Sequence, residues 1–181
     1  MTRCGSELTK RYASLTKEFV SVSLAVGDSL PDVPVFLAQP DGPMATTTGQ
    51  VFSNKRAVLF AVPGAFTPTC SARHLPGFVE KADAILDTGV DLIACVSVND
   101  AFVMAAWAVR QEAGETISMI ADGNGAFTQA LGLDQDMTER GMGQRSRRFA
   151  LVVNKGTVEH LFIESPGGYG VSSAENVLSQ L

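Results

Sequence analysis

One cysteine of the sequence lies where a reactive thiol could be stabilised. Residues 62–71 read VPGAFTPTCS, so Cys70 follows a Thr-Pro pair shortly after an apolar run. Thr67 is a good helix N-cap residue and Pro68 suits the first helical position, which places Cys70 at the third. Unpaired backbone N–H groups converge at the first turn of a helix and stabilise an anion. This spacing therefore suits a cysteine thiolate, the form of the side chain that acts as a nucleophile.

A helix terminus alone would not ionise such a thiol. An ordinary thiol is only about 3% thiolate at pH 7, and making it mostly thiolate takes roughly 3–4 kcal/mol. A helix N-terminus usually supplies about 0.3–1 kcal/mol. A cation is therefore needed, and one short segment contains four arginines: Arg140, Arg145, Arg147 and Arg148. Arg148 opens a β-rich segment, whose start lies beside the Cys70 loop if that segment pairs antiparallel with residues 56–62.

The elements that would position these side chains alternate between strands and helices. The order β–α–β–α–β–α–β–β–α implies parallel pairing in the middle of the sheet and a final antiparallel hairpin. The sequence thus predicts an α/β fold with a mixed central β-sheet flanked by helices, in a thioredoxin-like arrangement. Cys70 would lie at the carboxyl end of a strand, where such sheets place their sites. We expect strands at residues 56–62, 90–98, 117–120, 148–153 and 157–163, and helices at residues 70–88, 100–113, 126–131 and 172–181, the last opened by a Ser172–Glu175 capping box.

Length and composition limit the classes of function. A chain of 181 residues, 45% of them hydrophobic, is most simply one domain. A net charge of −5 recruits neither nucleic acid nor an anionic membrane. No apolar run approaches the ~20 residues that span a bilayer. The three cysteines, Cys4, Cys70 and Cys95, have neither C-x-x-C nor zinc spacing, so we expect free thiols in a reducing, cytoplasmic compartment, and no metal.

The N-terminal segment differs from the rest of the sequence. Residues 1–22 form an extension before the predicted domain, which we place at residues 23–181. The extension is rich in basic residues, and its apolar side chains follow helical spacing. It lacks the unbroken apolar stretch of a secretory signal. We therefore expect a loosely held arm or a helix packed on the protein's own surface, with a mitochondrial presequence as the alternative.

The cysteine motif resembles that of a known enzyme family. Pro63-x-x-x-Thr67-x-x-Cys70 matches the P-x-x-x-T-x-x-C motif of the peroxiredoxins. The blocks VPGAFTPTCS…HLPGF, LIACVSVNDAFVM and RRFALVV, in this order, are similar to the type II branch, which is atypical two-cysteine and peroxiredoxin-five-like. The resemblance extends from about Val26 to Leu181. It implies a thiol peroxidase that reduces hydrogen peroxide and small organic hydroperoxides.

The resemblance also implies a role for each motif residue. Cys70 would be the peroxidatic nucleophile, which attacks one peroxide oxygen and becomes a sulfenic acid. Thr67 would orient the thiolate and the peroxide, and Arg148 would stabilise the thiolate and the charge that develops along the breaking O–O bond. Pro63 would shield the pocket from water, while the backbone N–H groups of Thr69 and Cys70 would donate to the peroxide. Neither a metal nor an organic cofactor is implied.

The family resolves its sulfenic acid in several ways. Some type II members carry a resolving cysteine before the C-terminal helix, where this sequence has Val171, and others have one 25 residues after the first, which Cys95 matches. A helix followed by a returning strand would leave Cys95 about 10 Å below Cys70, whereas a disulfide needs Cα atoms within roughly 7 Å. We therefore predict that an external thiol (glutathione or glutaredoxin, or thioredoxin) reduces Cys70. A disulfide with Cys95 as the resolving residue is the alternative, and Cys4 is a more remote one.

Other classes of function fit parts of the pattern. His74 lies one helical turn after Cys70, as in a cysteine hydrolase, but the sequence places no third residue to orient the histidine. We expect His74 to support the pocket through a hydrogen bond instead. A non-peroxidase redox sensor or a binding module of thioredoxin fold would carry Cys70 without turnover.

The resemblance further implies a homodimer built from the loops around the active site, with Phe102 and Trp107 as apolar contacts.

Overall fold

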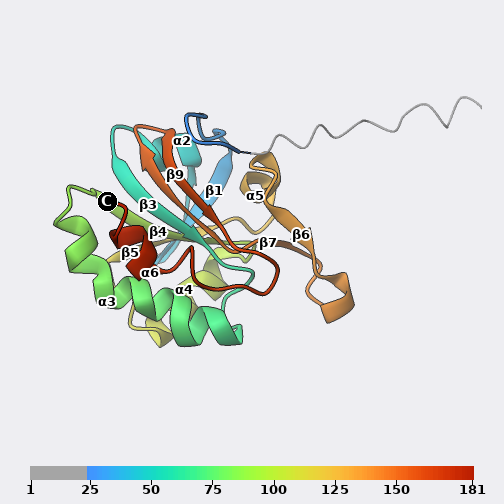
Figure 1. The fold of residues 1–181 in the computed structure, drawn as a ribbon. Helices are drawn as coiled ribbons and strands as arrows, with labels where there is room; N and C mark the ends of the chain where they lie inside the picture. Colours follow the sequence, from blue (N-terminus) through green and yellow to red (C-terminus); the bar gives the residue numbers. More distant parts are fainter. Residues whose placement is uncertain (1–23) are drawn as a thin grey trace, which may run out of the picture.

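The computed structural model describes residues 24–181, so the extension expected at residues 1–22 lies outside the described residues (Figure 1). Its centre is a seven-stranded sheet with the strand order β2-β1-β5-β4-β3-β8-β9. Strands β3, β4 and β5 are parallel, and antiparallel strands flank them on both sides. This mixed sheet confirms the predicted fold class. The strands are Pro34–Gln39 (β1), Gly42–Thr47 (β2), Arg56–Ala61 (β3), Leu92–Ser97 (β4), Ile117–Ala121 (β5), Phe149–Asn154 (β8) and Thr157–Ile163 (β9).

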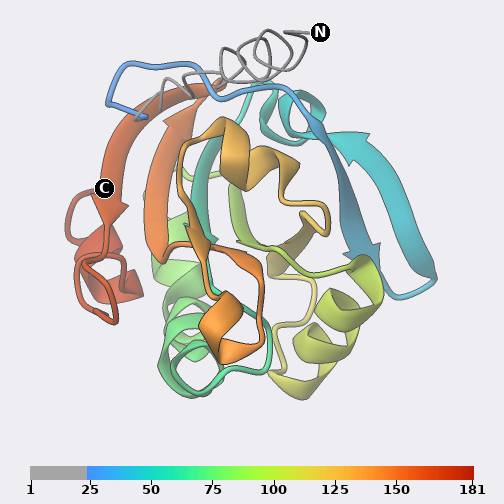
Figure 2. The ribbon, with the colours of Figure 1, turned by 90° about the vertical axis from the view of Figure 1, so that its right-hand side faces the viewer.

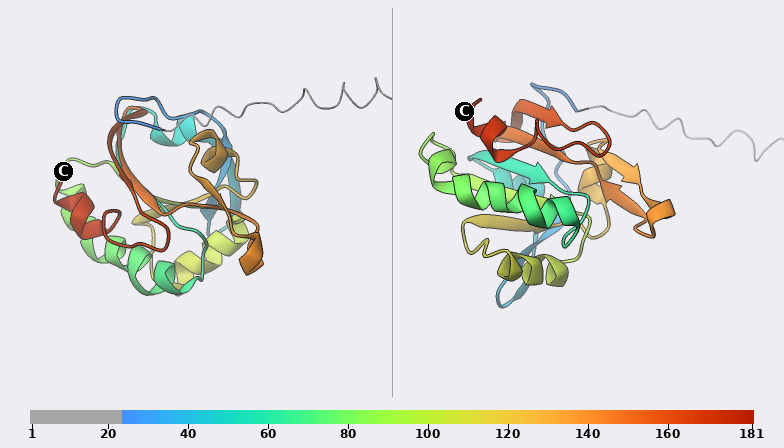
Figure 3. Two further views of the ribbon diagram at one scale, coloured as in Figure 1. Left: turned by 45° about the vertical axis from the view of Figure 1, so that its right-hand side comes forward. Right: turned by 60° about the horizontal axis from the view of Figure 1, so that its bottom comes forward.

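Helices cover both faces of the sheet, and each face has its own apolar core. Phe78 and Trp107 are fully buried on one face, and Phe52 and Phe127 on the other. Figure 2 brings α5 to the front of the sheet, and Figure 3 shows α3, α4 and α6 along the opposite side. No described helix is long and apolar enough to cross a membrane. The first face carries Cys70–His74 (η1), Leu75–Leu86 (α3), Ala101–Arg110 (α4) and Ala174–Leu178 (α6), and the second carries Thr48–Phe52 (α2) and Ala126–Ala130 (α5).

The structure contains strands that the sequence analysis did not anticipate. A hairpin of β1 and β2, followed by α2, precedes β3. Pro40 and Pro43 interrupt this segment, and proline argues against a strand except at an edge, where β2 lies. A second, two-stranded sheet pairs Asp134–Asp136 (β6) with Gln144–Ser146 (β7). Each of these two strands consists of three polar residues. They therefore show no alternation of apolar and polar residues from which a strand could be predicted.

Several helices end earlier than expected. The helix predicted at residues 70–88 begins at Pro68, includes a π-helical turn at Cys70–His74, and ends at Leu86. Helices α4 and α6 each end three residues before the predicted position. Helix α4 stops because Glu112 adopts a φ of 52°, a left-handed conformation that an α-helix does not continue. The order of these helices along the chain is nevertheless the predicted one.

The predicted capping box of the last helix is displaced by one residue. Ser173, not Ser172, is the N-cap, and its side chain accepts a hydrogen bond from the N–H of Asn176. Glu175 therefore lies in the first turn without closing a box on Ser172. The Ser172 hydroxyl donates to Glu164 at the end of β9 instead. Ser172 thus belongs to the loop before the helix.

The register of the sheet brings two distant segments together. Strand β8 pairs antiparallel with β3, and Ala61 at the end of β3 lies opposite Phe149 at the start of β8. Arg148 immediately precedes β8, so it lies where β3 ends and the Cys70 loop begins. This is the juxtaposition expected from antiparallel pairing.

Candidate active site

The loop between β3 and the Cys70 helix is held by hydrogen bonds and close packing. Thr67 donates its hydroxyl to the Gly64 carbonyl over 2.9 Å, and the Asn99 side chain accepts the N–H of Ala65 over 3.0 Å. Gly64 has little room for a side chain, because a Cβ there would lie 3.3 Å from the methyl group of Met142. These contacts give the loop a defined path into the helix.

The first turn of the helix is tied to a neighbouring helix. The Thr67 carbonyl accepts a hydrogen bond from the N–H of Ser71 over 3.0 Å, so the helix begins directly after Thr67, as predicted. The Thr67 hydroxyl, however, points back into the loop instead of capping the helix. The Trp107 indole in α4 donates to the Ser71 hydroxyl over 3.0 Å. Cys70 lies directly before this anchored serine.

Cys70 is fully buried and faces a guanidinium group. Its side chain belongs to the core cluster beneath α3 and α4. The Nη2 atom of Arg148 lies 3.5 Å from the Cys70 sulfur, a donor distance normal for a sulfur acceptor. The structure thus brings together the two groups that the sequence analysis paired.

The other arginines of the 140–148 segment have different partners. Arg145 donates to two backbone carbonyls of neighbouring loops, and Arg147 donates to the backbone carbonyl at the end of β9. Arg140 lies exposed in a short 3-10 helix, Thr138–Arg140 (η2). Of these four arginines, Arg148 is the one that contacts the Cys70 sulfur.

His74 is a buried, neutral histidine that Arg148 and Ser172 orient. Its Nε2 lies 3.0 Å from the Ser172 carbonyl, and its Nδ1 lies 2.9 Å from Nη1 of Arg148. A carbonyl only accepts and a guanidinium only donates, so Nε2 carries the proton and Nδ1 accepts. Burial, helped by the positive charge of Arg148, lowers the pKa of His74 to about 3.

The expected hydrogen bond of His74 is therefore present, but the statement that no other residue orients the histidine is wrong. The Ser172 carbonyl orients the imidazole, and it lies 98 residues away along the chain. The hydrolase interpretation still fails, because Nδ1 is occupied by Arg148 and Nε2 by Ser172. Neither nitrogen is free to take a proton from Cys70 as a general base.

A loop that the sequence analysis missed supports this histidine. The Oε1 atom of Glu164 accepts from the N–H of Gly170 over 2.6 Å, and from the N–H and hydroxyl of Ser172 over 2.8 and 2.9 Å. Burial alone would raise the pKa of Glu164, but the hydrogen bonds from Ser172 and Gly170 together lower it below its ordinary value. Glu164 is therefore a carboxylate that folds the loop. The one signal for it was an acid ending an apolar strand before a Pro-Gly-Gly-Tyr-Gly turn.

Tyr169 closes the same loop over the cationic side chains. Its ring centre lies 5.3 Å from that of His74 and 5.9 Å from the guanidinium carbon of Arg148. The guanidinium of Arg73 lies 4.4 Å from the ring, and the Tyr169 hydroxyl donates to the Arg73 carbonyl over 3.2 Å. Tyr169 therefore screens one side of the Arg148–His74 pair from solvent.

A cavity of about 780 Å³ opens in front of these residues. Four of the predicted site residues line it: Pro63, Thr67, Thr69 and Arg148. The opposite wall comes from residues 135–140 and 164–168 and from Met142, and Arg147 lies next to Arg148 in the lining. Cys70 does not line the cavity, since its side chain is fully buried next to Arg148. A peroxide must therefore pass between the lining residues to reach the sulfur.

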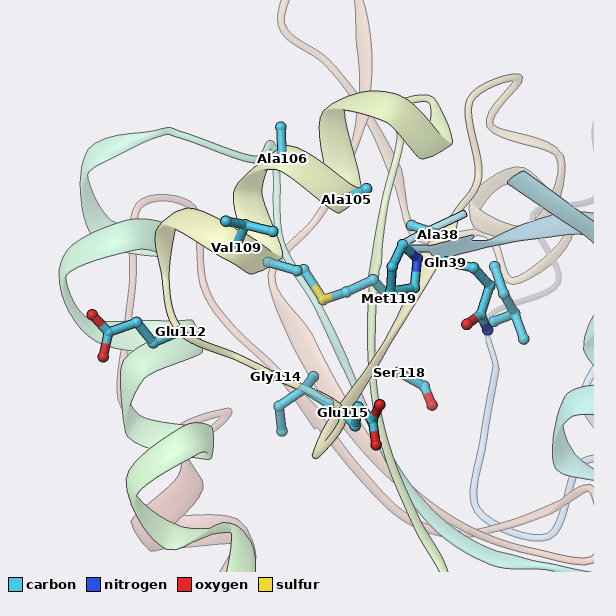
Figure 4. A pocket seen from close by; sticks show the side chains of 14 residues that line it. Ala38, Gln39, Ala105, Ala106, Val109, Glu112, Gly114, Glu115, Ser118 and Met119 are labelled. Atoms are coloured by element: carbon cyan, nitrogen blue, oxygen red, sulfur yellow. The ribbon is translucent and has the colours of Figure 1, made fainter. Parts of the chain in front are cut away.

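A second and slightly larger cavity, of about 860 Å³, lies elsewhere (Figure 4). It is formed by α4, the end of β1 and the start of β5, and small apolar residues such as Ala38, Ala105 and Ala106 line it. Its lining contains no cysteine, histidine or basic residue, so the chemistry expected of Cys70 has no place there. Among residues 24–181, no three or more His, Cys, Asp or Glu side chains gather as metal ligands.

Cys95, the candidate resolving residue, occupies the middle of the sheet. It pairs with Phe60 of β3 on one side and Met119 of β5 on the other, and it is fully buried. Burial raises the pKa of Cys95 well above its ordinary value, and the neighbouring charge on Cys70 adds to the shift. Cys95 is thus a protonated thiol in the core.

The two aromatic residues expected at a subunit contact lie in different environments. Phe102 is 72% exposed on α4, together with Phe66, which is 53% exposed in the loop before Cys70. Trp107 is fully buried, so the expectation that it contacts a second subunit is wrong. It faces inward because its indole donates to the Ser71 hydroxyl beneath the helix that carries Cys70.

Three comparisons relate the chain to known proteins. The family model for redoxins matches residues 25–178. The chain is 48% identical over 167 residues to Peroxiredoxin-2E-2, chloroplastic, from Oryza sativa subsp. japonica, covering 90% of this chain and 74% of that protein. It is 44% identical over 158 residues to the Hybrid peroxiredoxin hyPrx5 of Haemophilus influenzae, covering 86% of this chain and 65% of that protein. The structure of reduced Prx3 in complex with h2o2 from Vibrio vulnificus is similar, with a TM-score of 0.83, 47% identity, and coverage of 87% of this chain and 98% of that chain.

Proposed function

Because the chain belongs to the type II, peroxiredoxin-5-like branch of the peroxiredoxins and is a thiol-dependent peroxidase, we propose that Cys70 is the residue that attacks the peroxide. The observation that supports this assignment best is the 3.5 Å contact between the Arg148 guanidinium and the Cys70 sulfur. The other described cysteine, Cys95, has no such contact with a cation. Arg148 supplies the charge that the helix terminus alone could not.

In the proposed reaction the Cys70 thiolate attacks one oxygen of a hydroperoxide. A sulfur–oxygen bond forms as the O–O bond breaks, which gives a cysteine sulfenic acid. The leaving oxygen takes a proton and departs as an alcohol, or as water when the substrate is hydrogen peroxide. Arg148 stabilises the negative charge as it moves from the sulfur to the leaving oxygen, because the guanidinium is held in place before the reaction begins.

The residues around Arg148 would position the peroxide. The Thr67 hydroxyl is half-buried at the cavity wall and can rotate from the Gly64 carbonyl to a bound peroxide oxygen. The backbone N–H groups of Thr69 and Cys70 lie in the first helical turn, where no carbonyl precedes them in the helix. Pro63 narrows the cavity without offering a donor. The substrates we propose are hydrogen peroxide and small organic hydroperoxides.

We propose that an external thiol completes the cycle. That thiol attacks the Cys70 sulfenic acid to give a mixed disulfide and water, and a second thiol then releases the Cys70 thiolate. Cys95 is protonated and held between two strands, and Val171 occupies the loop position where some relatives carry a cysteine. Glutathione with glutaredoxin, or thioredoxin, is the proposed reductant. A two-cysteine cycle through Cys95 is the alternative, since both sulfurs belong to one core cluster.

One pair of measurements tests this function. The protein is expected to consume more than one equivalent of hydrogen peroxide or of a small organic hydroperoxide only when a thiol reductant is present. After one equivalent of peroxide without added thiol, mass spectrometry is expected to show oxidised Cys70 and free Cys95. Absence of consumption with every thiol would refute the peroxidase cycle. A Cys70–Cys95 disulfide that forms as fast as turnover would restore the two-cysteine cycle.

We also propose that the protein acts as a homodimer that buries Phe66 and Phe102. Both are large, exposed apolar side chains, and Phe66 lies in the loop that leads to Cys70. Light scattering at micromolar concentration is expected to give the mass of a dimer. Phe102→Asp is expected to shift this mass toward that of a monomer. A monomeric wild-type protein would refute this arrangement.

Finally, we propose that residues 1–22 are an extension, either an arm of the protein or an organelle presequence, and that residues 23–181 are the catalytic domain. The family model begins at residue 25, and the rice relative is named chloroplastic. Removal of residues 1–22 is therefore expected to leave peroxidase activity unchanged. A fluorescent fusion with and without the segment distinguishes an organelle presequence from a cytoplasmic protein that carries an arm.

A further inference from the structure

We propose that Glu164 is a positioning residue for the peroxidase reaction, which acts through Ser172 and His74 to set the orientation of Arg148. The inference rests on the proposed role of Arg148 toward Cys70. Glu164 directly follows β9, outside the motif that carries Cys70, and its carboxylate makes no hydrogen bond with the sulfur or with the guanidinium of Arg148. Its main-chain N–H donates to the Arg148 carbonyl over 3.0 Å, a contact that a side-chain substitution keeps. Its effect would reach the site through three successive contacts.

These contacts form a continuous series. The Glu164 carboxylate accepts the N–H and the hydroxyl of Ser172, which fixes the direction of the peptide that carries the Ser172 carbonyl. This carbonyl accepts the Nε2 proton of His74 over 3.0 Å. His74 Nδ1 then accepts from Nη1 of Arg148 over 2.9 Å, and Nη2 of the same guanidinium faces the Cys70 sulfur over 3.5 Å.

The geometry of a guanidinium makes this series effective. The group is planar and rigid, so a partner that holds one terminal nitrogen also sets where the other points. His74 holds Nη1 of Arg148, and Nη2 is thereby directed at Cys70. If the imidazole turned over, a protonated nitrogen would face the guanidinium and the contact would be lost. The Ser172 carbonyl prevents that turn by binding the proton on the far side of the ring.

Burial leaves the two middle residues of the series, Ser172 and His74, without alternative hydrogen-bond partners. His74 and Ser172 are fully buried, and Glu164 is 7% exposed. Apolar and aromatic rings, those of Phe60 and Tyr169, surround the imidazole at centre distances of 5.1 and 5.3 Å. Buried polar groups that lose a partner cannot exchange it for bulk water. Removal of the Glu164 carboxylate therefore leaves the Ser172 peptide, and with it the His74 ring, free to reorient.

The test is a double-mutant cycle between Glu164 and Arg148. The variants are Glu164→Ala, Arg148→Ala and their combination, with Glu164→Gln as the conservative change. Gln keeps an oxygen at the position of Oε1, which accepts all three hydrogen bonds. Glu159→Gln is the matched control, since Glu159 lies within β9, which Glu164 directly follows, but pairs with Arg56 at the other end of that strand. The measurements are the single-turnover rate of Cys70 oxidation by hydrogen peroxide, the pH midpoint of Cys70 alkylation, and the thermal midpoint.

We expect Glu164→Ala to slow Cys70 oxidation by about 10-fold, because small misplacements of a catalytic group have effects of this size. The alkylation midpoint is expected to move to higher pH. Glu164→Gln and Glu159→Gln are expected to behave nearly as the wild type. In the Arg148→Ala background, Glu164→Ala is expected to cause no further loss. A merely structural role would lower the thermal midpoint without this dependence on Arg148.

Each other outcome has a definite meaning. An equal loss from Glu164→Ala with and without Arg148 would overturn the inference, as would a wild-type rate in Glu164→Ala. If Arg148→Ala itself oxidises at the wild-type rate, the proposed role of Arg148 fails, and the inference fails with it. If Glu164→Ala does not fold, Ser172→Ala replaces it, since that change removes only the hydroxyl hydrogen bond. A smaller slowing in Ser172→Ala that again vanishes without Arg148 supports the inference, and its absence overturns it.

Discussion

Cys70 and Cys95 lie in the same apolar cluster and are both fully buried, yet their surroundings differ. Cys95 sits between two parallel strands, where the backbone hydrogen bonds are already made and only apolar side chains approach. Cys70 sits beyond the end of β3, where loops from distant parts of the chain converge. Burial keeps a thiol neutral unless a charged partner is buried beside it. A charged partner such as Arg148 can approach Cys70 beyond the end of β3. None can approach Cys95, which lies in the middle of the sheet.

The sharpest test of this comparison exchanges each cysteine in turn. Cys70→Ser is expected to reduce peroxidase turnover by at least ~10³-fold, since it removes the nucleophile while the fold is kept. Cys95→Ser is expected to keep most of the turnover when an external thiol is supplied. Peroxide consumption with a thiol reductant measures both. A Cys70→Ser variant that retains a tenth of wild-type turnover would overturn the assignment.

The second prediction concerns the positive charge of Arg148 beside Cys70. Arg148→Ala is expected to slow peroxide attack by about 10²-fold and to shift Cys70 alkylation to higher pH, because a preorganised donor next to the reacting sulfur is lost. Arg147→Ala is the matched control, since Arg147 donates to a backbone carbonyl and not to the sulfur. A pH series of alkylation rates measures both variants. Equal effects of the two substitutions would contradict the choice of Arg148.

The third prediction concerns the neutral histidine beside Cys70. Its pKa of about 3 in the folded protein lies below the ordinary value of 6.5, so the unfolded chain binds a proton first as pH falls. The contribution of His74 to stability is complete above about pH 6.5 and is lost progressively toward pH 3. Between pH 7 and pH 5 we expect the unfolding free energy to fall by about 2 kcal/mol. Urea unfolding measures this loss.

A control isolates His74 from the second histidine, His160. The His160→Gln variant is expected to keep the loss between pH 7 and pH 5, and His74→Gln is expected to flatten it. A wild-type protein whose stability does not change over this interval would show that His74 takes up its proton in the folded state over the same pH range as in the unfolded chain. That result would also remove the acceptor that Arg148 needs.

The smallest effect is expected from a substitution of Cys95, the buried thiol in the middle of the sheet. Cys95→Ala removes one sulfur from the core and is expected to lower the unfolding free energy by about 1 kcal/mol. Activity with an external thiol is expected to stay within about twofold of the wild type, because no polar group depends on Cys95. Thermal unfolding and the peroxidase assay check the two parts. A large loss of activity with an intact fold would show that Cys95 takes part in the cycle.

The same contrast explains how much the sequence could predict. The strand before Cys70, the helix after it and the pairing of β3 with β8 follow from local patterns, and they suffice to place Arg148. Glu164, Ser172 and Tyr169 could not be found this way. These residues lie near His74 only because the loop after β9 folds back over the histidine. No hydrophobic periodicity in the sequence predicts the path of that loop.

Some local features of the fold also could not be predicted, because the sequence allowed two choices or hid the correct one. Two serines in a row could each cap the last helix, and the choice of Ser173 releases Ser172 for Glu164. The hairpin of β1 and β2 was hidden by its prolines. Phe102 and Trp107 both suit an amphipathic helix, but only the packing of α4 on Ser71 decides which one faces inward.

The hydrogen bond between Trp107 and Ser71 has an optical consequence. Trp107 is the chain's single tryptophan, and its indole is buried against the residue that follows Cys70. Any rearrangement of this turn would change the polarity and hydrogen bonding of the indole. The tryptophan fluorescence of the protein, excited apart from that of its two tyrosines, therefore reports on one turn of one helix. Oxidation of the Cys70 sulfur is thus expected to change the fluorescence of Trp107, without any added label.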